Sequence, residues 1–186
     1  MSTVVIDAGH GGEDIKGAVF EAAHEDEINL NIAYFVDFYL TMGGHSVVLT
    51  RDTDVYVSLF SRVQITERQN ADAFVTIHCN SDKDTTQQGM ELCIGKTPSL
   101  GDLHLAWHIE KTMLMMFPDR RHWGIKNSQY YIDKISRPAV MIRTGFLTNT
   151  PDRHFLIKVE NQKRLGKCIA EGIMRYLLFM GGKYRW

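Results

Sequence analysis

The sequence predicts an α/β fold: a three-layer domain with a central mixed, mainly parallel sheet and helices on both faces. Short apolar runs typical of strands alternate with segments whose apolar residues recur at helical spacing. The run at 73–77 is continuously apolar, as in strands covered on both faces. A chain of 186 residues that is 44% hydrophobic can bury one sizeable core. No linker or repeat divides it, so we expect a single domain over residues 1–186.

The elements follow in order along the chain. Residues 4–7 predict the first strand, and the glycine-rich loop 8–12 can turn sharply at its end. Residues 25–42 carry apolar side chains at helical spacing before Gly43 and Gly44, which predicts the first helix. Further strands are expected at 46–50, 73–77, 89–94, 130–132 and 139–142. Further helices are expected from residue 59 to before residue 70, over 100–117 and over 165–180.

Charge and composition exclude several kinds of partner. Lysine and arginine number 21 against 22 acidic residues, so no basic field is available to hold nucleic acid. No run of about 18 uncharged apolar residues occurs, so no membrane-spanning helix is expected. The cysteines Cys79, Cys93 and Cys168 are odd in number and widely spaced, which is typical of reduced thiols. The N-terminal residues predict a strand without a leader, so we expect a protein made in the cytoplasm without a signal peptide.

Three residues are candidate metal ligands. His10 and His78 each follow an expected parallel strand, at the edge where such sheets place functional groups. Glu25 stands in the first turn of the first helix. Two histidines and one carboxylate, with a fourth position open, form an established ligand set for catalytic zinc. The spacing alone also allows an ordinary structural role, with Glu25 favoured by the helix dipole and both histidines in loops or at strand ends.

Five segments, in order, resemble the zinc-dependent N-acetylmuramoyl-L-alanine amidase family. They are VIDAGHGG at 5–12 with Asp14 and Gly17-Ala18 after it, EDEINL at 25–30, VLTRD at 48–52, ADAFVTIHCN at 71–80, and PAVMI with GFLTN at 138–142 and 145–149. The resemblance implies that His10, Glu25 and His78 bind Zn²⁺. It also implies that the substrate is peptidoglycan, cut at the amide between the muramoyl lactyl group and L-alanine.

Two neighbours of these residues are weaker ligand candidates. Glu27 lies two residues after Glu25 and points to a different face of the helix, and Glu25 is the one that matches the motif. Cys79 follows His78 directly, and successive strand residues face opposite sides of a sheet. We therefore expect Cys79 to be a buried residue.

The chain departs from the family at Arg143, the position of the family's catalytic glutamate, which Thr144 follows as the variable position. Arginine stays protonated and offers only donors, so it cannot accept a proton from water. Four explanations are open: an engineered inactive form, a natural non-catalytic relative, a carboxylate recruited from elsewhere, or stabilisation of the oxyanion by Arg143. Glu91 is the candidate substitute, although the family often carries glutamate there too. A salt bridge from Arg143 to a nearby acid is a further interpretation.

Other patterns are weaker indications of function. His104 and His108 share a helix face, but Leu105 replaces the glutamate of a zinc-protease motif, so an ordinary amphipathic helix is expected. The loop at 9–12 lacks the third glycine of a dinucleotide-binding motif, and Asp14 in its place would repel phosphate.

Aromatic and basic residues in the second half of the chain are candidates for substrate contact. Trp123, Tyr130 and Tyr131 either flank a glycan or peptide groove or fill the core. The basic run at 120–122 is expected to be a solvated turn, with contact to the carboxylates of a peptide stem as the alternative.

The sequence thus predicts a zinc-dependent peptidoglycan amidase with His10, Glu25 and His78 as ligands and Arg143 in the catalytic position. We expect the role of a phage or prophage endolysin that acts on the cell wall after release. The alternative is an impaired or inactive amidase-like protein that binds peptidoglycan, because Arg143 replaces the expected glutamate. The sequence leaves the oligomeric state open.

Overall fold

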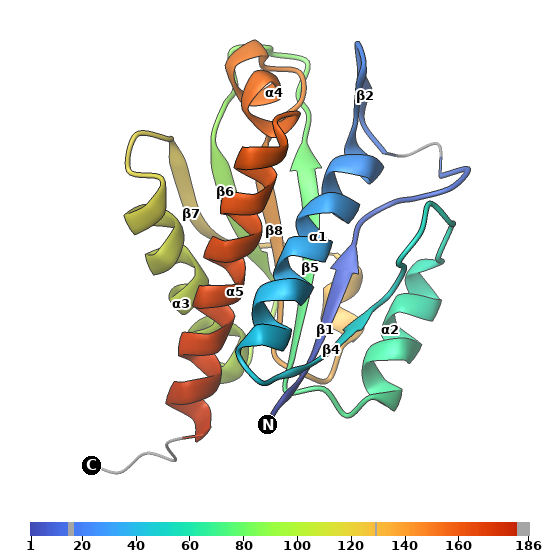
Figure 1. Cartoon of the computed structure of the whole chain (residues 1–186), viewed down its shortest axis with the longest axis vertical. Helices are drawn as coiled ribbons and strands as arrows, with labels where there is room; N and C mark the ends of the chain where they lie inside the picture. Colours follow the sequence, from blue (N-terminus) through green and yellow to red (C-terminus); the bar gives the residue numbers. More distant parts are fainter. Residues whose placement is uncertain (15–16, 129, 182–186) are drawn as a thin grey trace.

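A six-stranded sheet forms the centre of the computed structural model, which describes residues 1–14, 17–128 and 130–181 (Figure 1). The strands are β1 (Thr3–Ala8), β4 (Ser46–Leu49), β5 (Ala73–Asn80), β6 (Met90–Ile94), β7 (His122–Asn127) and β8 (Ala139–Phe146), in the order β4-β1-β5-β8-β6-β7. The first four in that order are parallel, β6 is antiparallel to β8, and β7 is parallel to β6. The predicted mixed, mainly parallel sheet is confirmed.

Helices cover both faces of this sheet. One face carries α1 (Glu25–Met42), α3 (Leu100–Met116) and α5 (Val159–Gly181), and Figure 1 shows α5 lying between α1 and α3. The other carries α2 (Leu59–Arg68) and the 3₁₀ helix η1 (Tyr131–Lys134). The short helix α4 (Thr150–Leu156) precedes α5, and the hairpin β2 (Val19–Phe20) and β3 (Ala23–His24) leads into α1. The predicted three-layer architecture is confirmed.

The core divides between the two faces because successive strand residues point to opposite sides of a sheet. In β1, Val4 and Ile6 pack in the larger cluster under α1, α3 and α5. Val5, between them, packs in a smaller cluster with Phe74 and with Ile132 of η1. Both faces of the central strands are therefore buried, as the continuous apolar runs predicted.

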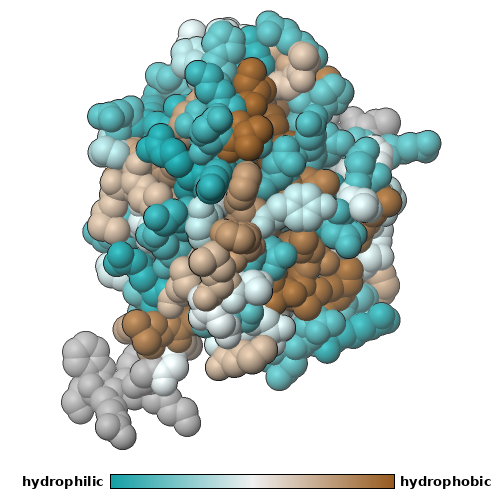
Figure 2. Space-filling model, in the orientation of Figure 1, coloured by the Kyte–Doolittle hydropathy of each residue, from teal (hydrophilic) through white to brown (hydrophobic). Residues whose placement is uncertain are grey.

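The outer surface of α1 and α5 alternates between hydrophilic and hydrophobic areas (Figure 2). Tyr34, Phe38 and Met42 of α1 are among the exposed large hydrophobic side chains. In the part of the chain that the structure describes, no helix has both the length and the hydrophobicity needed to cross a bilayer.

Two local predictions were wrong, and a third was right only in part. Residues 130–132 were expected to be a strand, but η1 occupies 131–134, and the hydroxyl of Tyr131 reaches a buried carboxylate from there. The expected turn at 120–122 is right in part: Arg120 lies in the turn after α3 and Arg121 is exposed, but His122 is the first residue of β7, an edge strand with no apolar run to mark it. Finally, β5 and β8 continue past their apolar runs, so His78 and Arg143 lie inside strands and in register with each other.

Candidate metal centre

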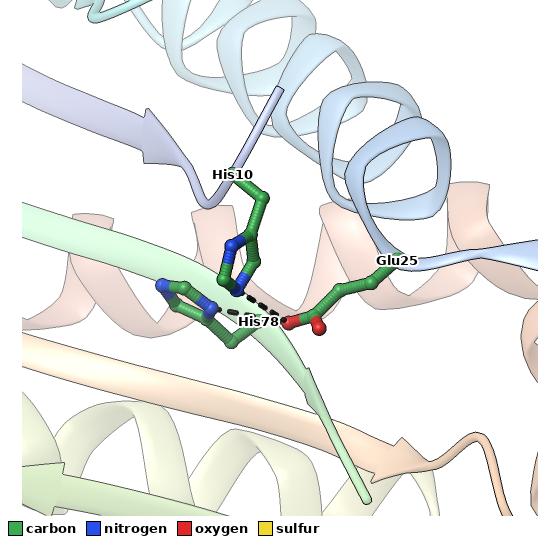
Figure 3. A group of neighbouring side chains, drawn as sticks. All are labelled: His10, Glu25 and His78. Atoms are coloured by element: carbon green, nitrogen blue, oxygen red, sulfur yellow. Dashed lines mark hydrogen bonds and ion pairs between the residues drawn. The ribbon is translucent and has the colours of Figure 1, made fainter. Parts of the chain in front are cut away.

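His10, Glu25 and His78 converge at one edge of the sheet (Figure 3). His10 lies in the loop after β1, Glu25 is the first residue of α1, and His78 is near the end of β5. The three side chains each offer one ligand atom, and these atoms lie within 4.8 Å of one another. Glu25 Oε1 is 3.1 Å from His78 Nδ1 and 3.5 Å from His10 Nε2. The structure therefore brings together all three residues predicted as ligands.

The loop that carries His10 has an unusual backbone and is held from two sides. His10 itself has φ of 61°, a left-handed conformation that few residues other than glycine adopt. At Gly9, a Cβ atom would lie 2.3 Å from Cε1 of His78, so only glycine allows the two segments to approach this closely. Arg62 Nη2 donates to the carbonyl of His10 at 2.8 Å, and Arg51 Nη2 donates to the carbonyl of Gly9 at 3.1 Å. These two buried arginines fix the strained loop.

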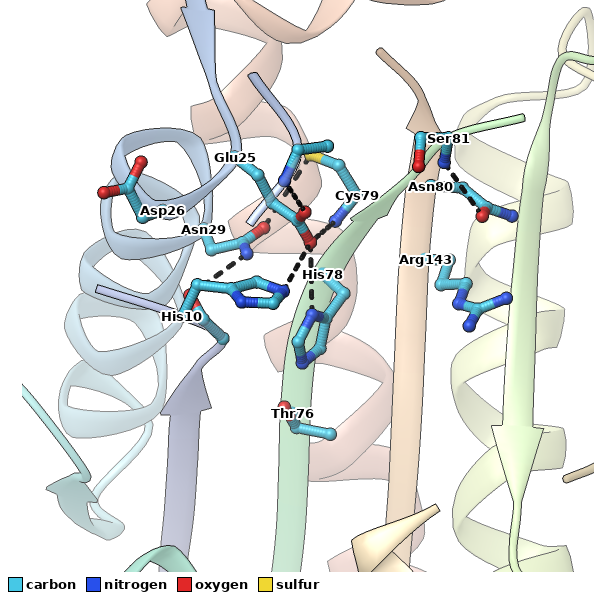
Figure 4. A network of polar contacts seen from close by, with 12 residues as sticks. His10, Glu25, Asp26, Asn29, Thr76, His78, Cys79, Asn80, Ser81 and Arg143 are labelled. Carbon is cyan, nitrogen blue, oxygen red and sulfur yellow. Dashed lines mark hydrogen bonds and ion pairs between the residues drawn. The ribbon is translucent and has the colours of Figure 1, made fainter. Parts of the chain in front are cut away.

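The carboxylate of Glu25 is fixed by backbone donors as well as by the histidines (Figure 4). Its Oε2 accepts from the backbone N–H of Ala18 at 2.8 Å, and its Oε1 accepts from that of Cys79 at 3.0 Å. Burial raises the pKa of Glu25, but hydrogen bonds and attraction to His10 and His78 outweigh it and lower the pKa well below its usual range. The carboxylate is therefore ionised, the form that binds a metal.

Each histidine has one ring nitrogen near Glu25 and a second nitrogen in a different environment. His10 Nδ1 lies 2.9 Å from Asp14 Oδ2, an arrangement that orients the ring and turns Nε2 toward Glu25. Burial lowers the pKa of His10, but Glu25 and Asp14 together raise it further than burial lowers it. In His78, Nε2 is buried without a hydrogen-bond partner among the described residues.

Two of the distances within the cluster match those expected around a tetrahedral zinc ion. Zinc–nitrogen and zinc–oxygen bonds of about 2.0–2.2 Å place neighbouring ligand atoms roughly 3.4 Å apart. The distances from Glu25 Oε1 to His78 Nδ1 and His10 Nε2, 3.1 and 3.5 Å, are close to this value. Three protein ligands leave one tetrahedral position for water or substrate. Metal binding itself stays a prediction.

A buried carboxylate, Asp7, lies just before the His10 loop and ties four segments together. It accepts from Thr50 Oγ1 at 2.5 Å, Thr76 Oγ1 at 2.6 Å and the Tyr131 hydroxyl at 2.5 Å, and it pairs with Arg62. Arg62 continues the network to the carbonyl of His10. Asp7 therefore links the loop of the ligand cluster to α2, β5 and η1.

The ligand cluster faces a cleft of about 500 Å³. Tyr130, Tyr131 and Arg143 contribute to its wall. Of the two interpretations given for the aromatic residues, the groove therefore holds for both tyrosines, although they also pack against the smaller core cluster. Tyr130 also borders a second hollow of about 490 Å³, in which Lys96 and Lys134 take part. Ligand sites for small molecules commonly have volumes of about 300–1,000 Å³. The cleft is large enough for part of a muramoyl-peptide.

Arg143 lies in the wall of the cleft and is paired with Glu91. His78, Arg143 and Glu91 are register partners across β5, β8 and β6, so their side chains share one face of the sheet. Arg143 Nη1 donates to Glu91 Oε1 at 2.7 Å, Arg143 Nη2 donates to the Tyr130 hydroxyl, and Lys126 Nζ lies 2.6 Å from Glu91 Oε2. Burial raises the pKa of Glu91, but Lys126 and Arg143 lower it further than burial raises it. Glu91 is thus a poor substitute for the missing base.

Other candidate residues lie away from the cluster. His104 and His108 contact the ring of Phe179 at 4.8 and 5.5 Å between centroids, which is contact between α3 and α5. Among the described residues, neither belongs to a group that could hold a metal. Cys79 is buried, as expected, with its thiol 3.8 Å from Asn29 Oδ1. Burial also raises its pKa well above the usual value.

The contacts of Lys126, Asp7 and Asp14 were not predicted from the sequence, although Asp7 and Asp14 belong to the first family motif. Asp14 stands four residues after His10 within that motif, which is a usable signal for a carboxylate that supports a ligand. Lys126 carries no local signal, because its pairing with Glu91 depends on how β7 and β6 lie side by side.

Comparison with known proteins identifies similar sequences and folds over nearly the whole chain. A family model described as N-acetylmuramoyl-L-alanine amidase matches residues 4–175. The N-acetylmuramoyl-L-alanine amidase LytC of Bacillus subtilis is 31% identical over 176 residues, which are 94% of this chain but 35% of LytC. The structure of the amidase AmiC2 of Nostoc punctiforme has 34% identity and a TM-score of 0.89, with 95% of this chain and 97% of that one covered. The catalytic domain of CwlV from Bacillus (Paenibacillus) polymyxa has 31% identity and a TM-score of 0.88, with 95% and 98% covered.

Proposed function

Because the chain belongs to the N-acetylmuramoyl-L-alanine amidase family, we propose that it is a zinc-dependent hydrolase that cleaves peptidoglycan between the muramoyl lactyl group and L-alanine. One observation carries the zinc-dependent part of this proposal. The ligand atoms of His10, Glu25 and His78 lie within 4.8 Å of one another and face a cleft of about 500 Å³. Two imidazoles and a carboxylate with one open position are a ligand set of catalytic zinc.

The protein residues have defined tasks in this proposal. A zinc ion held by His10, Glu25 and His78 would supply a Lewis acid and would lower the pKa of a water molecule. Glu25 supplies negative charge, which its ionised state at neutral pH provides. Asp14 keeps the ring of His10 oriented through its contact with Nδ1. The cleft beside them positions the amide of the substrate.

Arg143 is the residue that favours the alternative, a peptidoglycan-binding protein without catalysis. It cannot take the proton that a glutamate would accept, and Glu91 is held by two cations. The intact ligand cluster and the open cleft support the enzyme instead, because a purely binding role requires neither. A guanidinium in the cleft wall can donate to a negatively charged oxygen, so the predicted catalytic part of Arg143 is charge stabilisation and not proton transfer.

The test is release of free L-alanine amino groups from purified peptidoglycan, with mass spectrometry to identify the cut bond. We expect activity that a chelator removes and one equivalent of zinc restores. His10→Ala should lose both zinc and activity, whereas His154→Ala, an exposed histidine on α4, should keep both. A protein that binds zinc one to one but releases no amino groups would refute the catalytic proposal and support the binding alternative.

The biological setting is a separate proposal. We propose that the protein acts on the cell wall after release from the cytoplasm, as a phage or prophage endolysin does. Lysis of a bacterial culture on expression together with a membrane-permeabilising protein, and not without it, would support this setting. Lysis without permeabilisation would contradict it.

A further inference from the structure

We propose that Arg143 and Lys126 form a subsite for a carboxylate of the stem peptide, so that the enzyme selects stems with a free acid near the cleaved amide. The proposal rests on the proposed amidase function and gives Arg143 a role in substrate selection. It concerns the region between the ligand cluster and the β7 edge of the sheet.

The first argument is position. Arg143 is the register partner of His78 on the adjacent strand, and both side chains line the same cleft. Glu91, on the next strand, is the register partner of Arg143, and Lys126 reaches Glu91 from β7. Metal ligand, guanidinium and ammonium groups therefore follow one another across neighbouring strands. A substrate whose amide lies at the metal centre would extend its next groups over these cations.

The second argument is charge. In the described part of the chain, the ion pairs of Arg143 and of Lys126 both go to the single carboxylate of Glu91. Lys126 Nζ, at 2.6 Å, already neutralises Glu91. Arg143, Lys126 and Glu91 together therefore carry one positive charge in excess. A structural ion pair alone needs only one of the two cations. The excess charge favours an anionic group of the ligand at this place.

The third argument is that both cationic side chains are accessible to a ligand and yet are held in place by their neighbours. The side chain of Arg143 is 23% exposed and that of Lys126 is 46% exposed, so both can reach a ligand. Arg143 is held by Glu91 and by the Tyr130 hydroxyl, which leaves part of its planar fork of five N–H donors for a further acceptor. Lys126 lies 4.7 Å from the centroid of the Trp123 ring, which limits its freedom. Cations ordered in advance lose less entropy when they bind a carboxylate.

Carboxylate is the anion that fits the proposed substrate. Stem peptides carry carboxyl groups that are either free or amidated, and a guanidinium distinguishes the two because it donates strongly to a carboxylate and weakly to an amide. Loss of one such charge-assisted contact typically lowers affinity by about tenfold, equivalent to about 1.4 kcal/mol.

The experiment compares two synthetic muramoyl-tripeptides that end in lysine amide. They differ only in whether the second stem residue carries a free α-carboxylate or an α-carboxamide. We expect the wild-type chain to hydrolyse the acid with a kcat/KM about tenfold higher than the amide, mainly through KM. Lys126→Gln and Arg143→Gln should each reduce that ratio several-fold. Lys163→Gln, an exposed lysine on α5, serves as the matched control and should leave the ratio unchanged.

Calorimetric titration with the free tripeptides, one acidic and one amidated, separates this proposal from the proposed function. If neither substrate is hydrolysed, the amidase proposal fails. Preferential binding of the acidic tripeptide, abolished by Lys126→Gln, would still support the subsite.

Equal hydrolysis or equal binding of acid and amide by the wild-type chain overturns the subsite proposal. So does an acid preference that survives in folded Lys126→Gln and Arg143→Gln variants. Circular dichroism of each variant checks folding, and Lys126→Gln changes a half-exposed side chain, so it is the variant least disturbing to the core.

Discussion

Replacing Asp7 with asparagine should strongly destabilise the fold. Asp7 is completely buried, and its carboxylate accepts hydrogen bonds from Thr50, Thr76 and Tyr131 while it pairs with Arg62. Asparagine keeps one carbonyl oxygen but adds N–H donors where hydroxyl and guanidinium donors already point. It also leaves the guanidinium of Arg62, of which 2% is exposed, without a counter-charge.

The expected magnitude follows from that unpaired charge. Removing one partner of a buried ion pair costs about 3–5 kcal/mol. Arg62 keeps its hydrogen bonds to the carbonyls of Val57, Ala8 and His10, so the lower half of that range is expected. Domains are typically stable by about 5–15 kcal/mol, so the loss is a large fraction of the total. For a chain of this size, about 2–4 °C per kcal/mol gives a fall in Tm of roughly 6–16 °C.

The assay is urea unfolding at pH 7 followed by circular dichroism, with a thermal scan beside it. Asp72→Asn is the matched control, because Asp72 is an exposed acid that accepts a hydrogen bond from the backbone N–H of Thr3. We expect that control to lose less than about 1 kcal/mol. A loss for Asp7→Asn no larger than for Asp72→Asn would refute the view that Asp7 and Arg62 hold the segments together.

The same carboxylate predicts how stability depends on pH. Burial raises the pKa of Asp7, but attraction to Arg62 and hydrogen bonds from Thr50, Thr76 and Tyr131 lower it below the ordinary value of 3.8. Because the folded pKa lies below the unfolded one, the contribution of Asp7 is fully present above about pH 4 and is lost as pH falls through the folded pKa. The difference in unfolding free energy between wild type and Asp7→Asn should therefore narrow below pH 4. A difference that stays constant from pH 7 to 2.5 would contradict the ionised state of Asp7.

Three further predictions concern the site and the thiols. Asp14→Asn should weaken zinc binding by about 10–100-fold, measured by competition with a chelator, and an unchanged affinity would show that Asp14 does not orient His10. Arg143→Glu should raise the rate of amide release by about 10²–10⁴-fold if the site lacks only its base, and no gain with zinc bound would exclude that account. The thiols of Cys79, Cys93 and Cys168 are buried, and burial raises the pKa of Cys168 to about 12, so alkylation at pH 8 should require unfolding. Rapid labelling of the native protein would contradict this burial.

The sequence predicted best where local pattern and fold agree. Apolar spacing and the glycines at 43 and 44 gave α1 its observed bounds, Glu25–Met42. The convergence of His10, Glu25 and His78 follows from the rule that parallel strands and the helices after them present their ends at one edge of the sheet. Each of these features depends on neighbouring residues or on a general rule of topology.

The sequence could not predict features that depend on distant pairing. β7 is an edge strand with half-exposed side chains, so no apolar run indicates it. Tyr131 was predicted in a strand from the residues around it, but its hydrogen bond to Asp7, 124 residues away in the chain, favours η1 at that point. The partners of Arg143 could not be predicted from the sequence either, because its contact with Glu91 requires the antiparallel register of β6 and β8.

The antiparallel register of β6 and β8 places residue 143 opposite Glu91, which affects what an arginine does there. A glutamate there would lie directly opposite Glu91, with Lys126 as the nearest cation for two carboxylates. Two neighbouring carboxylates raise the pKa of one of them, which suits a base but costs stability unless a further cation is present. Arginine reverses this balance, since it pairs with Glu91 and Tyr130 and leaves a surplus of positive charge in the cleft wall. The cleft around Arg143 is therefore built for an anion, and restoring the base alone changes what the cleft binds as well as how it catalyses.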